Sequence, residues 1–165
     1  MAFAGAEAAE DEGAGMTTIE AARDTAQAAG GDVTKVDAVT TKVNGRFIVN
    51  ANGKHFVSDT RASIGGPGEA VQAGELLLSA LASCGLGLIQ THARGQGIEL
   101  GEVAITAAFK RHADDPTRYD YIRLAVGFED RISHQTADAC IKHFTDNCPI
   151  YNTLRRGGPI SIERE

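Results

Sequence analysis

Residues 73–93 read AGELLLSALASCGLGLIQTHA, and this stretch decides the fold. Small and apolar side chains occupy nearly every position, so a helix built from it has no continuous polar side. A helix that is apolar all round is buried, and we therefore expect a central helix from about Ala73 to Ala93. Gly95 and Gly97 are expected to end it, because glycine favours the position that follows a helix.

The segment before this helix predicts an antiparallel meander of three strands. Asn44-Gly45 and Asn52-Gly53 favour two-residue hairpin turns, since both residue types tolerate positive φ. Residues 64–68 contain three glycines and a proline, so they predict a loop into the helix. The strands themselves are runs rich in β-branched and aromatic residues at 36–43, 46–49 and 55–58.

The segment after the helix alternates apolar and polar residues and then returns to helical spacing. Ser133 is expected to cap a second helix that runs to about Asp146, where Cys148-Pro149 stops it. Three strands complete the prediction, at Val103–Lys110, Tyr119–Phe128 and Ile160–Ile162. The expected order is β-β-β-α-β-β-α-β, an α+β fold with a buried central helix.

The chain has 165 residues, which suits one domain with a hydrophobic core. Residues 1–16 are small and acidic without an apolar period, so we expect a flexible tail there. Residues 17–31 predict a short helix, and residues 32–165 predict the folded domain.

Composition excludes several classes of partner. The formal charge is -6, which disfavours binding to nucleic acid backbones. We expect no run of the roughly 18 apolar residues that a bilayer span needs, and therefore no membrane partner. Three cysteines, an odd number, and the lack of a signal-peptide pattern indicate a reducing, cytoplasmic location.

Cys84 and Cys148 are the candidate reactive residues, and the residues alone leave two interpretations open for each. Cys84 lies among small and apolar neighbours, so it is either a buried structural thiol or a nucleophile. A nucleophile needs a cation to lower its pKa, and none lies within one helical turn. Cys148 follows a helix C-terminus, which disfavours a thiolate, so it is either a core thiol or a resolving thiol.

A metal site is the weakest interpretation. Cys140, His143 and Cys148 form a C-x2-H-x4-C string, but a structural zinc site takes four ligands and no second pair has suitable spacing. We therefore expect no metal and no resident cofactor, and Cys140 is expected in the core.

Four segments in the right order resemble the OsmC/Ohr family, that is, the osmotically inducible and organic hydroperoxide resistance proteins. Residues 74–86, GELLLSALASCGL, resemble its central-helix signature, and residues 58–68 resemble its glycine-rich loop. Residues 147–151, NCPIY, resemble its second cysteine segment. Residues 158–162 resemble its closing strand, so the likeness covers about residues 35–163.

The resemblance implies an intertwined homodimer with thiol-dependent peroxidase activity, best with organic hydroperoxides. Cys84 is then the peroxidatic thiol that becomes a sulfenic acid, and Cys148 is the resolving thiol that closes a disulfide. A lipoyl or thioredoxin-like dithiol reductant restores both. The alternative is a non-enzymatic dimer that binds a small molecule or serves a stress response.

The resemblance also implies an arginine and a glutamate that activate the thiolate. Arg46 is the first candidate for the arginine and Arg61 the second. Glu75 is the candidate acid, but it lies nine residues before Cys84, a rise of about 13 Å along a helix. Gly74 occupies the position where the family's acid is expected.

Overall fold

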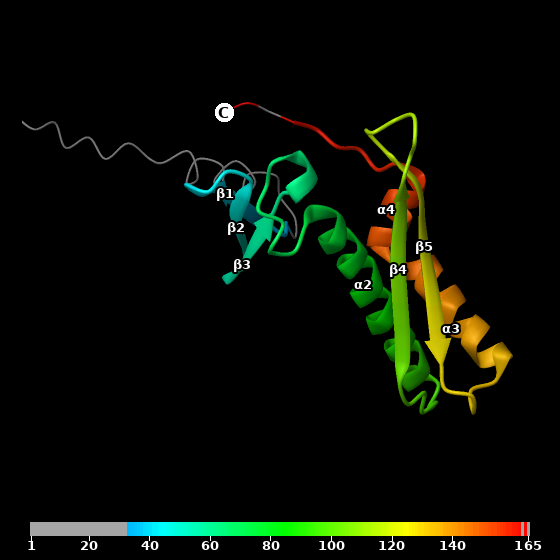
Figure 1. Ribbon diagram of the computed structural model, residues 1–165. Coiled ribbons are helices and arrows are strands. Elements are labelled where there is room, and N and C mark those ends of the chain that lie inside the picture. Colours follow the sequence, from blue (N-terminus) through cyan, green and yellow to red (C-terminus); the bar gives the residue numbers. More distant parts are fainter. Residues whose placement is uncertain (1–32, 163, 165) are drawn as a thin grey trace, which may run out of the picture.

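The computed structural model describes residues 33–162 and residue 164, and in this part of the chain the fold is α+β, as predicted (Figure 1). The predicted tail 1–16 and helix 17–31 lie outside the described residues. In chain order the elements are β1 (Val36–Thr40), β2 (Arg46–Ala51), β3 (Lys54–Asp59), a 3-10 turn (Ala62–Ile64), α2 (Ala73–Gly95), β4 (Val103–Arg111), β5 (Tyr119–Phe128), α3 (His134–Asn147) and α4 (Pro149–Arg156).

The first sheet is the predicted antiparallel meander, in the order β1-β2-β3. Asn52 and Gly53 both have positive φ, 52° and 80°, and they join β2 to β3 through a two-residue turn. The prediction of a second such turn at Asn44-Gly45 is wrong. Only Gly45 has positive φ, and β1 and β2 pair from Thr40 outward, so a longer loop connects them.

Helix α2 begins at a capping box. The Gln72 side chain accepts a hydrogen bond from the backbone of Glu75, and the Glu75 carboxylate accepts one from Gln72 N–H at 2.8 Å. The helix runs over the predicted range and packs on β4, α3 and α4. Its predicted burial on all sides is wrong for the single chain, because one stripe alone is buried, at Leu81, Gly85, Ile89 and Ala93.

By length and composition alone, α2 is long and apolar enough to cross a membrane. The expectation that no segment reaches the length of a bilayer span was therefore wrong. The core helix of a water-soluble domain passes the same test. Because α2 packs along one side on β4, α3 and α4, we interpret it as a core helix with an uncovered side.

The second sheet is the hairpin β4-β5, which pairs from Val103 with Phe128 to Arg111 with Tyr119. Ser133 caps α3 as predicted, since its side chain accepts a hydrogen bond from Thr136 N–H. The main core lies between α2, α3 and this hairpin, and its buried members are Ile89, Ala93, Leu100, Cys140, Phe144 and Cys148.

The end of the chain differs from the prediction. Residues 160–162 form no strand within the described chain, and Ile160 and Ile162 are 91% and 95% exposed. Helix α4 was not predicted. It forms because Pro149 suits the first position of a helix, where a missing N–H costs nothing, and Gly157 ends it with positive φ.

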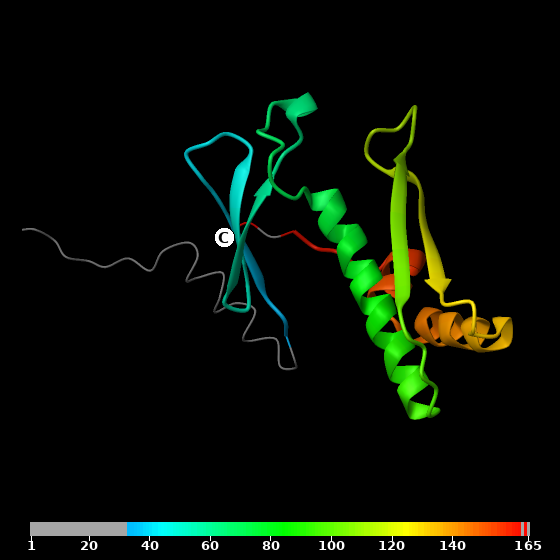
Figure 2. The ribbon, with the colours of Figure 1, turned by 60° about the horizontal axis from the view of Figure 1, so that its bottom comes forward.

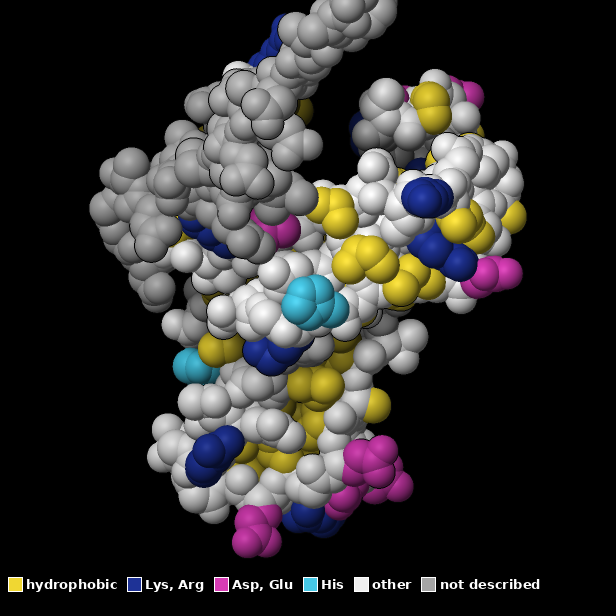
Figure 3. All heavy atoms as spheres, turned by 90° about the vertical axis from the view of Figure 1, so that its left-hand side faces the viewer, with side chains coloured by type: hydrophobic (Ala, Val, Ile, Leu, Met, Phe, Trp, Pro, Cys, Tyr) yellow, Lys and Arg dark blue, Asp and Glu magenta, His cyan; other side chains and the backbone are white. Residues whose placement is uncertain are grey.

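The β1–β3 sheet lies apart from the group formed by α2, β4, β5, α3 and α4 (Figures 1 and 2). The loop before α2 joins the two parts, and Val71 pairs with Ser58 at the edge of β3. Hydrophobic side chains gather on the face shown in Figure 3. Apolar residues on the meander and its loop are exposed, among them Val36, Ile48, Val57 and Ile64.

Candidate active site

The structure brings Cys84 and Cys148 together, although they are 64 residues apart in the sequence. Their Sγ atoms are 2.8 Å apart, within hydrogen-bond contact, and both thiols are free. A disulfide needs an S–S distance of about 2.05 Å, so a small movement suffices to link them. Cys84 is partly buried, whereas Cys148 is inaccessible to solvent.

Cys148 sits at the junction of two helices. It ends α3 with its backbone N–H bonded to the Phe144 carbonyl, and it begins α4 as the N-cap. The N–H of Tyr151 donates to Cys148 Sγ at 3.3 Å. Cys148 follows the C-terminus of α3 as predicted, but it also begins α4, and the N-terminal end of that helix favours negative charge on this sulfur.

Cys84 reaches Cys148 because the residue after it has no side chain. A Cβ on Gly85 would lie 2.8 Å from Ile105 Cδ1 and 3.1 Å from Phe144 Cζ. Glycine thus lets α2 approach β4 and α3 closely enough for the two sulfurs to touch.

The environment of Cys84 opposes ionisation in the single chain. Burial raises the pKa of the Cys84 thiol to about 11, with a further contribution from its hydrogen bond to Cys148. No cationic side chain of residues 33–162 donates a hydrogen bond to either sulfur. The chain described here supplies the thiol pair but not the charge that would activate it.

Arg46, the first candidate for the activating arginine, is bonded to two carboxylates and not to the thiols. Its guanidinium donates to Asp59 at 2.8 Å and 2.9 Å and to Glu69 at 2.7 Å. The hydrogen bond from Arg46 holds the pKa of the Asp59 carboxyl below its usual range. Asp59 also accepts the N–H groups of Glu69 and Ala70, so this ion pair fixes the glycine-rich loop to the meander.

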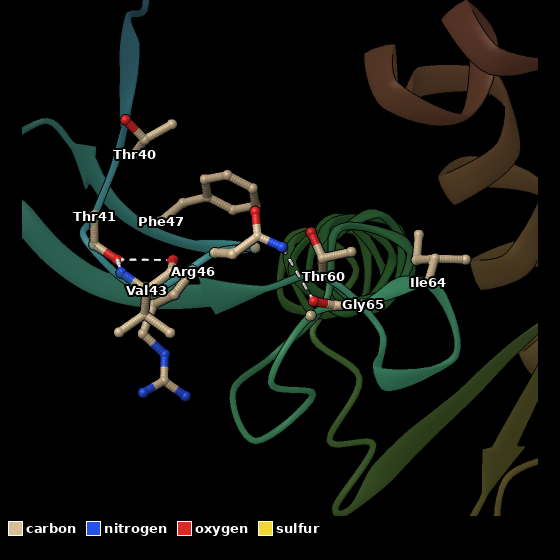
Figure 4. Close-up of a pocket in the computed structure, with 11 residues that line it drawn as sticks. Thr40, Thr41, Val43, Arg46, Phe47, Thr60, Ile64 and Gly65 are labelled. Carbon is tan, nitrogen blue, oxygen red and sulfur yellow. Dashed lines mark hydrogen bonds between the residues drawn. The ribbon is translucent and has the colours of Figure 1, made fainter.

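A pocket of about 290 Å³, which Arg46 helps to line, lies between the meander and the glycine-rich loop (Figure 4). Asn44 donates to the Gly65 carbonyl across it, while the Arg46 guanidinium points away from Thr60 and Gly65. Within one chain, therefore, Arg46 does not meet Cys84. Arg61, the second candidate, has no side-chain hydrogen bond or ion pair with residues 33–162.

Glu75 is not brought to the thiols either. Its carboxylate caps the first turn of α2, about 13 Å along the helix from Cys84. Gly74 explains why no acid stands one position earlier: a Cβ there would lie 2.8 Å from the Phe109 ring and 3.0 Å from Tyr119 Oη. Two aromatic side chains occupy the space that a catalytic acid would need.

The possible metal ligands diverge. His143 stacks on His92, with ring centroids 4.6 Å apart, and Cys148 turns toward Cys84. Cys140 is fully buried in the core, as predicted. Among the described residues, no three histidine, cysteine or acidic side chains form a metal-binding group.

Sequence reasoning missed a cavity lined by residues of α2, β5 and α4, and the arginine among them. The cavity has about 330 Å³ and is lined by Leu81, Ile122, Leu124, Tyr151, Leu154 and Arg155. In the segment PIYNTLRR, Tyr151, Leu154 and Arg155 recur at helical spacing, and this spacing is the sequence signal for α4.

Comparison with protein families gives one match, to the family described as OsmC-like protein, over residues 66–163. Comparison with curated proteins found no significant match.

Comparison with solved structures gives several similar folds. An OsmC-like protein from Mycoplasma pneumoniae is 17% identical, with a TM-score of 0.65, covering 76% of this chain and 89% of that one. An organic hydroperoxide resistance protein from Legionella pneumophila is 21% identical, with a TM-score of 0.57 and coverage of 76% and 91%. OhrB of Bacillus subtilis, also named for organic hydroperoxide resistance, is 17% identical, with a TM-score of 0.55 and coverage of 79% and 96%. At these identities the likeness shows the fold alone.

Proposed function

The chain belongs to the OsmC-like protein family, and from that premise we propose that it is a thiol-dependent peroxidase that reduces organic hydroperoxides with Cys84 and Cys148. One observation carries the proposal: the two sulfurs lie 2.8 Å apart. The names of two similar structures, as organic hydroperoxide resistance proteins, support the substrate class.

The reaction proceeds in two steps. The Cys84 thiolate attacks one peroxide oxygen, so an S–O bond forms, the O–O bond breaks, and the alcohol leaves after taking a proton. The Cys148 thiolate then attacks the sulfenic sulfur of Cys84, so an S–S bond forms, the S–O bond breaks, and the leaving hydroxide takes the proton that Cys148 released and departs as water. Tyr151 N–H and the α4 N-terminus stabilise negative charge on Cys148 for this second step.

A dithiol reductant completes the cycle. It is lipoyl or thioredoxin-like, and exchange with the Cys84–Cys148 disulfide returns two thiols while the reductant is oxidised to its own disulfide. Cys84 is the accessible member of the pair, so we expect the reductant to attack there.

The protein acts as an intertwined homodimer, and the cation that ionises Cys84 comes from the second copy. The exposed apolar residues of the meander, the uncovered side of α2 and the exposed Ile160 and Ile162 support a dimer. Arg61 becomes the better candidate for that cation, because Arg46 is already bonded to Asp59 and Glu69. Light scattering of the full chain checks the dimer, and a monomer would contradict it.

The test of function compares two cysteine variants. Cys84→Ser removes the attacking sulfur, so we expect turnover of cumene hydroperoxide with a dithiol reductant to vanish. Cys140→Ala is the matched control. Cys140 is also a buried thiol of the same core, but within the described chain it forms no hydrogen bond with Cys84 or Cys148. Full turnover by Cys84→Ser would refute the proposal.

A second candidate is a non-enzymatic binding protein of the same fold. The raised pKa of Cys84, about 11 because of burial and the Cys148 contact, favours it. An unreactive Cys84 in the assembled protein, together with a bound small molecule, would support this candidate over the peroxidase.

A further inference from the structure

We propose that Asn152 is a positioning residue for the resolving thiol: its side-chain amide fixes the break between α3 and α4, so that Cys148 Sγ stays in contact with Cys84. This inference deepens the proposed function and rests on it, because that function gives Cys148 the resolving role. Among the described residues, Asn152 forms no hydrogen bond with either sulfur. It acts through the backbone around Cys148 and does not touch the reacting atoms.

The break between the two helices is a consequence of Pro149. Cys148 is the single residue between α3 and α4. Proline has no N–H, and inside a helix its ring clashes with the carbonyl four residues earlier, which here is that of Thr145. The residue before a proline prefers an extended conformation, and Cys148 has φ -77° and ψ 114°. The last carbonyls of α3 therefore need donors from outside that helix.

The side chain of Asn152 supplies the donor that Pro149 lacks. Its Nδ2 atom lies 3.0 Å from the Thr145 carbonyl oxygen and 3.0 Å from the Cys148 carbonyl oxygen. The carbonyl oxygen of Asp146 is a third and longer contact, at 3.4 Å. The backbone N–H of Asn152 also donates to the Cys148 carbonyl, at 3.0 Å. One residue of α4 thus binds the carbonyls of the last turn of α3 and of the junction itself.

The neighbours of the Asn152 amide determine its orientation. Nδ2 carries two hydrogens and faces carbonyl oxygens, which can only accept, whereas Oδ1 accepts a hydrogen bond from the Arg156 guanidinium at 3.3 Å. The reversed amide would place its oxygen against those carbonyls and its N–H groups against a cation. An apolar side chain at this position would leave partly buried carbonyls without their donor.

The direction of Cys148 Sγ depends on how α4 is fixed to α3. The N–H of Tyr151, in the first turn of α4, donates to this sulfur at 3.3 Å. The sulfur also contacts Cys84 Sγ at 2.8 Å, and Cys84 lies on α2, which Asn152 does not bond. Without the Asn152 amide, α4 can change its angle to α3, and the two sulfurs spend less time in contact. The chemistry of Cys84 itself stays the same.

Two leucine variants test this role. Asn152→Leu keeps the branched shape of the side chain and favours a helix more than asparagine does, but it has no N–H group. Asn147→Leu is the matched control, because the Asn147 side chain also donates to a carbonyl of α3, that of His143, at 2.9 Å. Within the described chain, the Asn147 side chain forms no hydrogen bond with Cys148.

The first experiment needs no peroxide. The reduced full-length protein is equilibrated with oxidised and reduced dithiothreitol, so that Cys84 and Cys148 lose two hydrogens and form a disulfide while oxidised dithiothreitol gains two and opens to its dithiol. We expect Asn152→Leu to lower this equilibrium constant about tenfold, the effect of about one lost hydrogen bond. Asn147→Leu is expected to match the unchanged protein. No change in Asn152→Leu, or an equal loss in both variants, would overturn the inference.

The second experiment separates the two steps of peroxide reduction. In an excess of cumene hydroperoxide, Asn152→Leu is expected to form the Cys84 sulfenic acid at the unchanged rate and to close the disulfide about tenfold more slowly. More Cys84 is then oxidised by a second peroxide to the sulfinic acid, which mass spectrometry measures. A general loss of structure slows both steps, so equal slowing would overturn the inference. If the dithiothreitol equilibrium depends on Asn152 but the unchanged protein reduces no peroxide, the peroxidase proposal fails and the positioning role stands.

Discussion

Replacement of Gly85 by alanine tests the packing that holds the two sulfurs together. Gly85 is buried where α2 meets β4 and α3, and the new Cβ would lie 2.8 Å from Ile105 and 3.1 Å from Phe144. Gly87 is two residues further along α2, and a Cβ there meets nothing within 4 Å. Both variants therefore place alanine in the interior of α2, and they differ in whether the new Cβ meets packed neighbours.

The expected difference in unfolding free energy between the two variants follows from two opposing effects. Each alanine gains up to about 1 kcal/mol over glycine in a helix interior, so this gain cancels in the comparison. Overpacking at Gly85 alone costs about 1–3 kcal/mol. Gly85→Ala is thus expected to be about 1–3 kcal/mol less stable than Gly87→Ala.

Urea unfolding of the two variants measures this difference. At a slope of about 1–3 kcal/mol per M, the midpoints should differ by roughly 1 M with equal slopes. We also expect Gly85→Ala to form the Cys84–Cys148 disulfide more slowly, since α3 must move away. Equal stability of the two variants would refute the packing on which the site depends.

Three further predictions concern the charges and thiols. Cys148→Ser is expected to accumulate one sulfenic acid on Cys84 after peroxide treatment, seen as a single dimedone adduct by mass spectrometry; no adduct would contradict the assigned order of attack. The pH midpoint of the alkylation rate of Cys84 in the assembled protein should lie below about 11, the pKa that burial gives this thiol in the single chain, because a partner arginine offsets the effect of burial. A midpoint at 11 or above would exclude that arginine. Arg46 lowers the pKa of Asp59 in the folded protein, so the ionised Asp59 stabilises the fold above the unfolded pKa of about 3.9, and this stabilisation is lost as pH falls toward the folded pKa. Asp59→Asn removes this titrating group, so its stability should fall less steeply with decreasing pH. An acid unfolding curve with the same pH dependence as the unchanged protein would contradict this.

The sequence predicted the elements whose signals are local. The β-branched runs, the alternation in β4 and β5, the Ser133 cap and the apolar 73–93 stretch each carry a pattern within one element, and each element formed close to its expected place. The capping role of Glu75 was not predicted, although an acid three residues after the N-cap is typical of a capping box.

Residues beyond one element were harder to predict. The contact between Cys84 and Cys148 depends on how α2 and α3 cross, and the family resemblance rather than periodicity pointed to it. The commitment of Arg46 to Asp59 depends on the register of β2 with β3, which pairs these two residues directly. Helix α4 was hidden because Pro149 reads equally well as the end of one helix or the start of another.

Peptide mapping after treatment with one equivalent of cumene hydroperoxide tests the central claim most directly. We expect a single new crosslink between Cys84 and Cys148, with a loss of two hydrogens, while the buried Cys140 stays reduced. If both thiols of the pair remain reduced while the peroxide persists, or if Cys84 oxidises to a sulfinic acid with Cys148 untouched, the two sulfurs do not act as a redox pair.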